Sequence, residues 1–355
     1  EGFSDMYKDI FRPGGIAEKG FAGMWSKSLH KPGIEFVYNE IRHAVRDEWC
    51  KSTLPRLSKI EAPALICGSF SDPLLHTRGS FRAFDMISSK HKWLYTHRQG
   101  KWAAFYSDEA KEFQLKFFDH FLHGKDNGML DVPSVRLEVR EFGNATKEVR
   151  YESQWPLTKT EWIDLYLNNN ALQETPPSNT SSKSFVIKNQ SVHFSYIFKQ
   201  DTEITGPMKA TLFLKLENAN DMNVFVGVQK FHNQQEVNFE GSYGFANDIV
   251  TKGFMNISLR KLNEEESKPY LPKHDYLKKE VLAEDQVAKL EIGLLPSSTF
   301  FKQGDELRLF IQGQFMLKAS KLDQVGDYEG STNSGNCVVL YGKEYPSSLL
   351  VPFIN

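Results

Sequence analysis

Two apolar segments joined by a helical one constrain the fold of this chain more than any other feature. Residues 62–68, APALICG, form a short continuous apolar run of the kind found in strands covered on both faces, and residues 91–96, HKWLYT, predict a second strand. The intervening residues 77–87, TRGSFRAFDMI, predict a helix. Two strands joined this way require a right-handed crossover and a parallel sheet.

A second helix is predicted directly after this unit, over residues 107–124. Ser107 is a suitable N-cap, and Asp108 and Glu109 place negative charge in the first turn. Gly124 is suited to close the helix. Its expected apolar stripe consists of Ala110, Phe113, Phe117, Phe121 and Leu122.

Beyond residue 130 the apolar period changes. Short segments such as VRLEVREF, MKATLFLKLE, NVFVGVQKF and ELRLFIQGQF, several of them alternating, are separated by turn-rich stretches. Many short strands at this spacing are typical of an antiparallel sandwich or jelly roll. The expected fold class is therefore α/β plus all-β.

Three regions follow from these patterns. Residues 1–57 have apolar residues at helical spacing, including a helix expected over 34–49, and are predicted to be a helical cap. Residues 58–130 supply strands and helices of an α/β core, and residues 131–355 the β domain. Two parallel strands alone cannot bury both faces of a sheet. Because the chain opens at Glu1 in what looks like mid-domain sequence, we expect a missing N-terminal segment to complete the core.

An acid and a histidine follow the two predicted strands. Asp72 comes just after the first, and His97 ends the second. Carboxyl ends of parallel strands share one sheet edge, where ligands and catalytic groups gather. An acid followed by a histidine is the order of the last two members of an α/β-hydrolase triad. The alternative is that Asp72 only forms a turn and that His97 is a loop residue without a special role. His76 is a second candidate for the triad histidine.

The nucleophile of such a triad is not evident. No G-x-S-x-G sequence occurs, although a nucleophile elbow should precede the acid. The serine and its oxyanion donors are thus expected outside these residues. His97 would accept the serine proton, and Asp72 would orient the imidazole.

Composition excludes several function classes. The 43 basic and 45 acidic residues give a net charge of -2, which argues against a nucleic-acid partner. Three dispersed cysteines form no zinc motif, so neither metal nor cofactor is expected. No apolar run is long enough for a membrane span. Few cysteines favour the cytoplasm, and sequons at Asn144, Asn179, Asn189 and Asn256 leave secretion open.

Several segments resemble the C-terminal part of the CocE/NonD hydrolases, the cocaine-esterase and X-Pro dipeptidyl-peptidase-like group. They are EGFSDMYKDIFRPGGI, APALICGSFSD, LYTHRQGKWAAFYS and, most specifically, FFDHFLHGKDNGMLDVPSVRLEV. The resemblance implies the end of an α/β-hydrolase core with a helical cap, then a galactose-binding-like β-sandwich jelly roll. It assigns the triad acid to Asp72 and the triad base to His97. WLYTH departs from the Gly-Pro-Trp that often precedes the family's histidine.

The resemblance also implies a substrate pocket walled by the cap residues Phe3, Met6, Tyr7 and Trp25, for which ordinary core packing is the alternative. The predicted function is a portion of a serine hydrolase that acts on small esters, amides or X-Pro-like peptides. The alternative is a non-catalytic binding or assembly module for glycans or proteins, in which Trp102 or Tyr243 would stack on sugars. A homo-oligomer, or a separate polypeptide supplying the serine, stays open.

Overall fold

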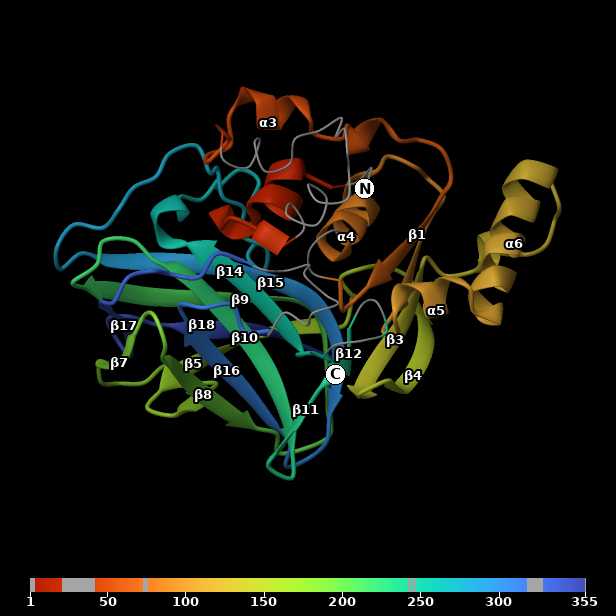
Figure 1. The fold of residues 1–355 in the computed structure, drawn as a ribbon. Coiled ribbons are helices and arrows are strands. Elements are labelled where there is room, and N and C mark those ends of the chain that lie inside the picture. Colours follow the sequence, from red (N-terminus) through yellow and green to blue (C-terminus); the bar gives the residue numbers. More distant parts are fainter. Residues whose placement is uncertain are drawn as a thin grey trace.

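The computed structural model describes residues 4–20, 42–72, 76–241, 244, 247–317 and 328–354. Short helical elements cover one side of a large, mostly antiparallel sheet, and the longest helix stands beyond its parallel end (Figure 1). No helix in these ranges is both long and apolar enough to cross a membrane. The helical elements are η1 (Met6–Phe11), η2 (Pro13–Gly15), α3 (Glu48–Ser52), η3 (Leu57–Lys59), α4 (Thr77–Met86), α5 (Lys101–Phe105), α6 (Asp108–His123), η4 (Met129–Asp131) and η5 (Ile257–Leu259).

The predicted strand–helix–strand–helix unit is confirmed. β1 (Ala64–Ser69) and β2 (Lys92–His97) pair in parallel, with α4 between them in sequence. α6 begins at the Ser107 cap, whose side chain accepts the Ala110 N–H, and ends at Gly124 in the left-handed conformation. The expected stripe is only partly buried, since Leu122 is 71% exposed.

The parallel part of the sheet contains more than two strands. This corrects the expectation that the two predicted parallel strands pair only with each other in this chain. β3 (Val135–Phe142) pairs in parallel with β2 and, at Thr299↔Arg140, with the long strand β15 (Val287–Phe301). One hydrogen-bonded path therefore leads from β1 into the β domain. The sequence pattern of β3 indicates a strand but not its partner.

The β domain has the predicted short strands, most of them antiparallel. Its largest core cluster joins residues from both halves of the domain, among them Phe194, Leu212, Leu290 and Val339. The remaining strands are β4 (Ala145–Glu152), β5 (Thr160–Asn168), β6 (Ala171–Gln173), β7 (Ser181–Val186), β8 (Ser191–Ile197), β9 (Thr202–Glu217), β10 (Asn223–His232), β11 (Gln235–Val237), β12 (Phe239–Glu240), β13 (Asn247–Asp248), β14 (Thr251–Asn256), β16 (Glu306–Gln312), β17 (Asn336–Tyr341) and β18 (Ser348–Ile354).

The N-terminal region differs from the expected long helix. Residues 43–47 are not helical, and α3 starts only at Glu48. The cause is Asp47, whose side chain accepts the Cys50 N–H and caps a new helix at this point. The earlier part of the expected helix, residues 34–41, lies outside the described residues.

Candidate active site

Asp72 lies in the turn between β1 and α4. Its side chain is 5% exposed, and its carboxylate accepts a hydrogen bond from Lys101 Nζ at 3.2 Å. His76 Nε2 is 3.9 Å from the same carboxylate oxygen. The Asp72 carbonyl also accepts the Thr77 N–H at the start of α4. The carboxylate is thus buried and paired with a cation from the loop after β2.

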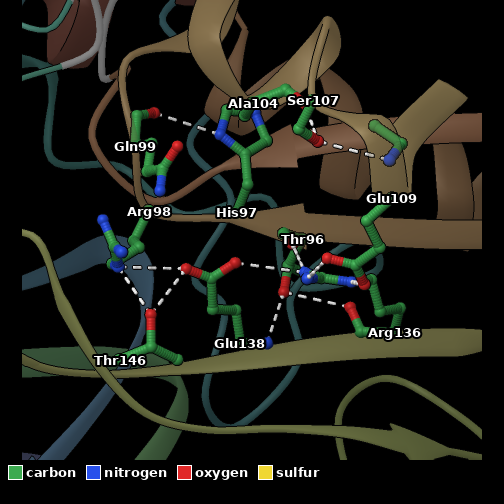
Figure 2. A network of polar contacts seen from close by, with 11 residues as sticks. Thr96, His97, Arg98, Gln99, Ala104, Ser107, Glu109, Arg136, Glu138 and Thr146 are labelled. Carbon is green, nitrogen blue, oxygen red and sulfur yellow. Dashed lines mark hydrogen bonds and ion pairs between the residues drawn. The ribbon is translucent and has the colours of Figure 1, made fainter.

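His97 is the last residue of β2 and stands beside Ser69, the last residue of β1. It is 7% exposed, and its Nδ1 lies 3.2 Å from the backbone oxygen of Gln99 (Figure 2). Because an N–H must donate to a carbonyl, this contact places the proton on Nδ1 and leaves Nε2 as an acceptor. That tautomer is the one a histidine base needs to take a proton from a hydroxyl.

The structure brings Asp72 and His97 to the same sheet edge but not into a hydrogen bond with each other. Each has another partner: Lys101 for the carboxylate and the Gln99 carbonyl for the imidazole. Their charges are still coupled, since the Asp72 carboxylate raises the pKa of His97. The triad assignment of both residues therefore stays a prediction. The hydrogen bond that a triad needs between the Asp72 carboxylate and the His97 imidazole is not formed in this structure.

Burial dominates the electrostatics of His97. Desolvation lowers the pKa of its imidazole below the usual 6.5, against the opposing effects of the Gln99 carbonyl, Glu138 and Asp72. The ring is therefore neutral at pH 7. A neutral imidazole with a free Nε2 lone pair is competent as a general base.

A network of charged groups fixes the strand that ends at His97. Successive side chains of a strand point to opposite faces, so Thr96 lies on the face away from His97 (Figure 2). The Thr96 hydroxyl accepts the Glu138 N–H, and Arg136 donates to the Thr96 carbonyl. Arg136 also binds both oxygens of Glu109 at 2.6 Å, which ties β3 to α6. These contacts hold the backbone that positions the imidazole.

The predicted pocket residues fall into two groups. Phe3 and Trp25 lie outside the described residues. Tyr7 is fully buried, and its hydroxyl donates to the Ala44 carbonyl at 3.1 Å. Met6 packs against the cluster that contains Ile10 and Phe11. These contacts show what both side chains touch, while their role as pocket walls stays a prediction.

Lys101 and Gln99 are the neighbours that sequence reasoning missed. Both belong to the segment RQGK directly after β2, whose polar sequence suggests an exposed loop. Lys101 is instead turned inward, with its side chain 19% exposed beside Asp72. No local signal distinguishes such a lysine from a solvated one, because its partner lies 29 residues earlier in the chain.

Among the described residues, one group has the composition of a metal site. Ligand atoms of His43, Asp47 and Cys50 lie within 4.8 Å of one another. Two of the three side chains already have a structural role, since Asp47 caps α3 and His43 donates to Asp47 at 2.6 Å. Burial raises the pKa of Cys50 to about 11, so its thiol holds its proton at neutral pH. A metal ion here would have to displace both the His43–Asp47 hydrogen bond and the Cys50 thiol proton.

Most of the chain matches a known protein family. Residues 127–350 match the family of the X-Pro dipeptidyl-peptidase C-terminal non-catalytic domain. The chain belongs to this family. No curated protein matches the chain.

Solved structures extend the similarity over the whole chain. Two crystal structures of a CocE/NonD family hydrolase from Staphylococcus aureus are 32% and 33% identical, each with a TM-score of 0.94 over 99% of this chain. The chain spans 66% of the length of that hydrolase. The resemblance to CocE/NonD hydrolases expected from the sequence is thus confirmed.

Two more distant structures share the fold. An aminopeptidase from a marine sediment Thaumarchaeota archaeon is 14% identical with a TM-score of 0.71, and covers 98% of this chain and 70% of its own. An α-amino acid ester hydrolase is 13% identical with a TM-score of 0.65, and covers 98% and 71%. The family match and the similar Staphylococcus aureus hydrolase support that the chain is a portion of a hydrolase-family protein.

Proposed function

We propose that this chain is the acid- and base-bearing portion of a serine hydrolase, acting on esters, amides or X-Pro-like peptides. The observation that carries the proposal is the burial of Asp72 and His97 at the carboxyl ends of two paired parallel strands. In this reading residues 58–130 end an α/β-hydrolase core, and the β domain is a jelly roll. The cytoplasm remains the predicted compartment.

The proposed reaction is acyl transfer through a serine outside these residues. Its Oγ attacks the substrate carbonyl while His97 Nε2 takes the hydroxyl proton. His97 then gives that proton to the leaving alcohol or amine as the acyl bond breaks, and water repeats the cycle to release the acid. We expect Asp72 to replace the Gln99 carbonyl at Nδ1 in the completed site, where it would stabilise the imidazolium.

Two surfaces of the chain are suited to bind a further segment of the hydrolase, which we propose as a partner. Among the described residues, β1 is paired only on the side of β2, so its other edge has free backbone groups. The neighbouring α5 and α6 expose large apolar side chains. Such a cluster is unusual on a free surface. Its members are Trp102, Phe105, Tyr106, Leu115, Phe118 and Leu122.

Turnover by two variants tests the assignment. In the longer protein that includes this chain, Asp72→Asn and His97→Ala should each lower kcat on a p-nitrophenyl ester by about 10³-fold or more, as triad substitutions do. His193→Ala is the matched control, because His193 is exposed on β8. Near-normal kcat in either variant, with the folded state intact, would remove that residue from the triad.

A binding module is the second candidate, favoured by an exposed aromatic pair. Trp102 is 59% exposed and stacks on Tyr106 with ring centroids 6.4 Å apart. Parallel exposed rings are suited to sugar faces, while Tyr243 lies outside the described residues. Glycan binding that Trp102→Ala abolishes, together with normal turnover in the triad variants, would favour this function.

A further inference from the structure

A second feature of the structure is a cavity of about 530 Å³ between η1, α4 and the β domain. Its size is typical of sites for small organic ligands. η1 contributes Lys8 and α4 contributes Arg78, while Lys273 and Tyr276 come from the segment after η5. Neither Asp72 nor His97 lines it.

The lining separates into an apolar and a charged part. Phe81 and Trp155 form part of the apolar wall, with ring centroids 5.0 Å apart, and Met86, Leu271 and Leu294 extend it. The charged part contains basic and acidic side chains from four segments of the chain. An amphipathic lining of this kind fits a ligand with one polar end.

Basic groups outnumber acidic ones in the described lining. The six bases are Lys8, Arg46, Arg78, Arg82, Lys268 and Lys273, and the four acids are Asp5, Asp9, Asp85 and Glu266. Three ion pairs use three of each: Arg46 with Asp5 at 3.5 Å, Arg82 with Asp9 at 2.6 Å and Lys268 with Asp85 at 3.0 Å.

The three remaining bases have no ion pair within the described part of the chain. Lys8 lies 5.6 Å from the ring centroid of Tyr276, and Arg78 lies 5.2 Å from that of Phe254. All three line the same cavity. Burial is the main cause of the lowered pKa of both Lys8 and Lys273, and neighbouring cations lower it further, Lys273 at Lys8 and Arg78 at Lys273. Glu266 alone remains to balance them.

Buried polar atoms beside these bases are also unsatisfied. Arg46 Nε has no acceptor among the described residues, Asp9 Oδ1 has no donor, and His274 Nε2 has no partner. His274 is 4% exposed, and burial lowers its pKa to about 4, so its ring is neutral. Buried polar groups without partners are costly. An anionic head group would accept from Arg46 Nε, whereas Asp9 Oδ1 needs a donor such as an ordered water.

We propose that this cavity binds an amphipathic organic anion, with its head group at Lys8, Arg78 and Lys273 and its apolar tail against Phe81 and Trp155. The head is a carboxylate or a phosphate, since both are anions that lysine and arginine bind. The proposal does not rest on the hydrolase function. It requires only the cavity and its excess of positive charge.

Calorimetric titration of the protein with four eight-carbon probes tests the proposal. Octanoate or octyl phosphate should bind, and the tighter of the two identifies the head group. Octan-1-ol and octylamine should bind at least tenfold more weakly, because neither offers negative charge to the three bases. Equal affinity for octan-1-ol, or no binding of either anion at millimolar concentration, would overturn the proposal.

Two lysine variants locate the site. Lys273→Met and Lys8→Met keep much of the side-chain volume and remove one charge, so each should weaken binding of the preferred anion at least tenfold. Lys188→Met, at an exposed lysine of the β domain, is the matched control and should bind normally. Thermal melting identifies any variant that fails to fold, in which case the other variant decides. Unchanged affinity in a folded lysine variant would contradict the placement.

Discussion

At the residue scale, the protonation state of His97 connects the structure to chemistry. The contact with Gln99 selects the Nδ1 tautomer, and burial keeps the ring uncharged. Asp72 is held by Lys101 instead. The same sheet edge therefore has a neutral imidazole and a buried carboxylate, each of which binds another group.

The lowered pKa of His97 predicts the acid limb of the pH profile. As pH falls through this pKa the imidazole gains a proton and stops acting as a base, so kcat/KM should fall with it. Because burial places the pKa below the usual 6.5, the midpoint of the loss should lie below pH 6.5. Ester hydrolysis by the longer protein, followed from pH 4 to 8, measures it. A midpoint above 6.5 would contradict the dominance of burial and would indicate that contact with Asp72 stabilises the imidazolium more than burial destabilises it.

At the element scale, local pattern predicted the strands and helices better than their partners. The continuous apolar run before Asp72 and the Ser107 and Gly124 caps each encode local geometry, and the structure has those elements. β3 pairs in parallel with β2 on one side and with β15, more than 150 residues later, on the other, and no local pattern encodes either partner. The edge positions of Asp72 and His97 were predictable because each residue lies at the end of a strand that local pattern identifies. The inward position of Lys101 and the cavity were not predictable, because they depend on residues far apart in the sequence.

Removing one buried side chain should show how far the parallel strands depend on their core. Leu94 in β2 is fully buried in a cluster with Ile66, Phe81 and Val135. Leu94→Ala should lower the free energy of unfolding by about 2–5 kcal/mol, as cavity-forming substitutions do. Urea denaturation measures this loss. Leu130→Ala is the control, since Leu130 is 53% exposed, and a similar loss in both variants would contradict the assigned core.

At the scale of the whole molecule, the two ends of the described chain differ in how completely their strands are paired and their apolar side chains buried. The β domain closes a large apolar core, whereas β1 has an open edge and α5 and α6 expose apolar side chains beside the candidate site. The similar Staphylococcus aureus hydrolase is longer, and this chain spans 66% of it. These features support the proposal that the chain is a portion of a larger hydrolase.

Covalent labelling with a fluorophosphonate tests that central claim most directly. The probe reacts with serine nucleophiles activated by a neighbouring base. In the longer protein, peptide mapping by mass spectrometry should find one labelled serine, outside residues 1–355, and His97→Ala should abolish the labelling. A labelled serine within residues 1–355, or labelling that survives His97→Ala, would contradict the account.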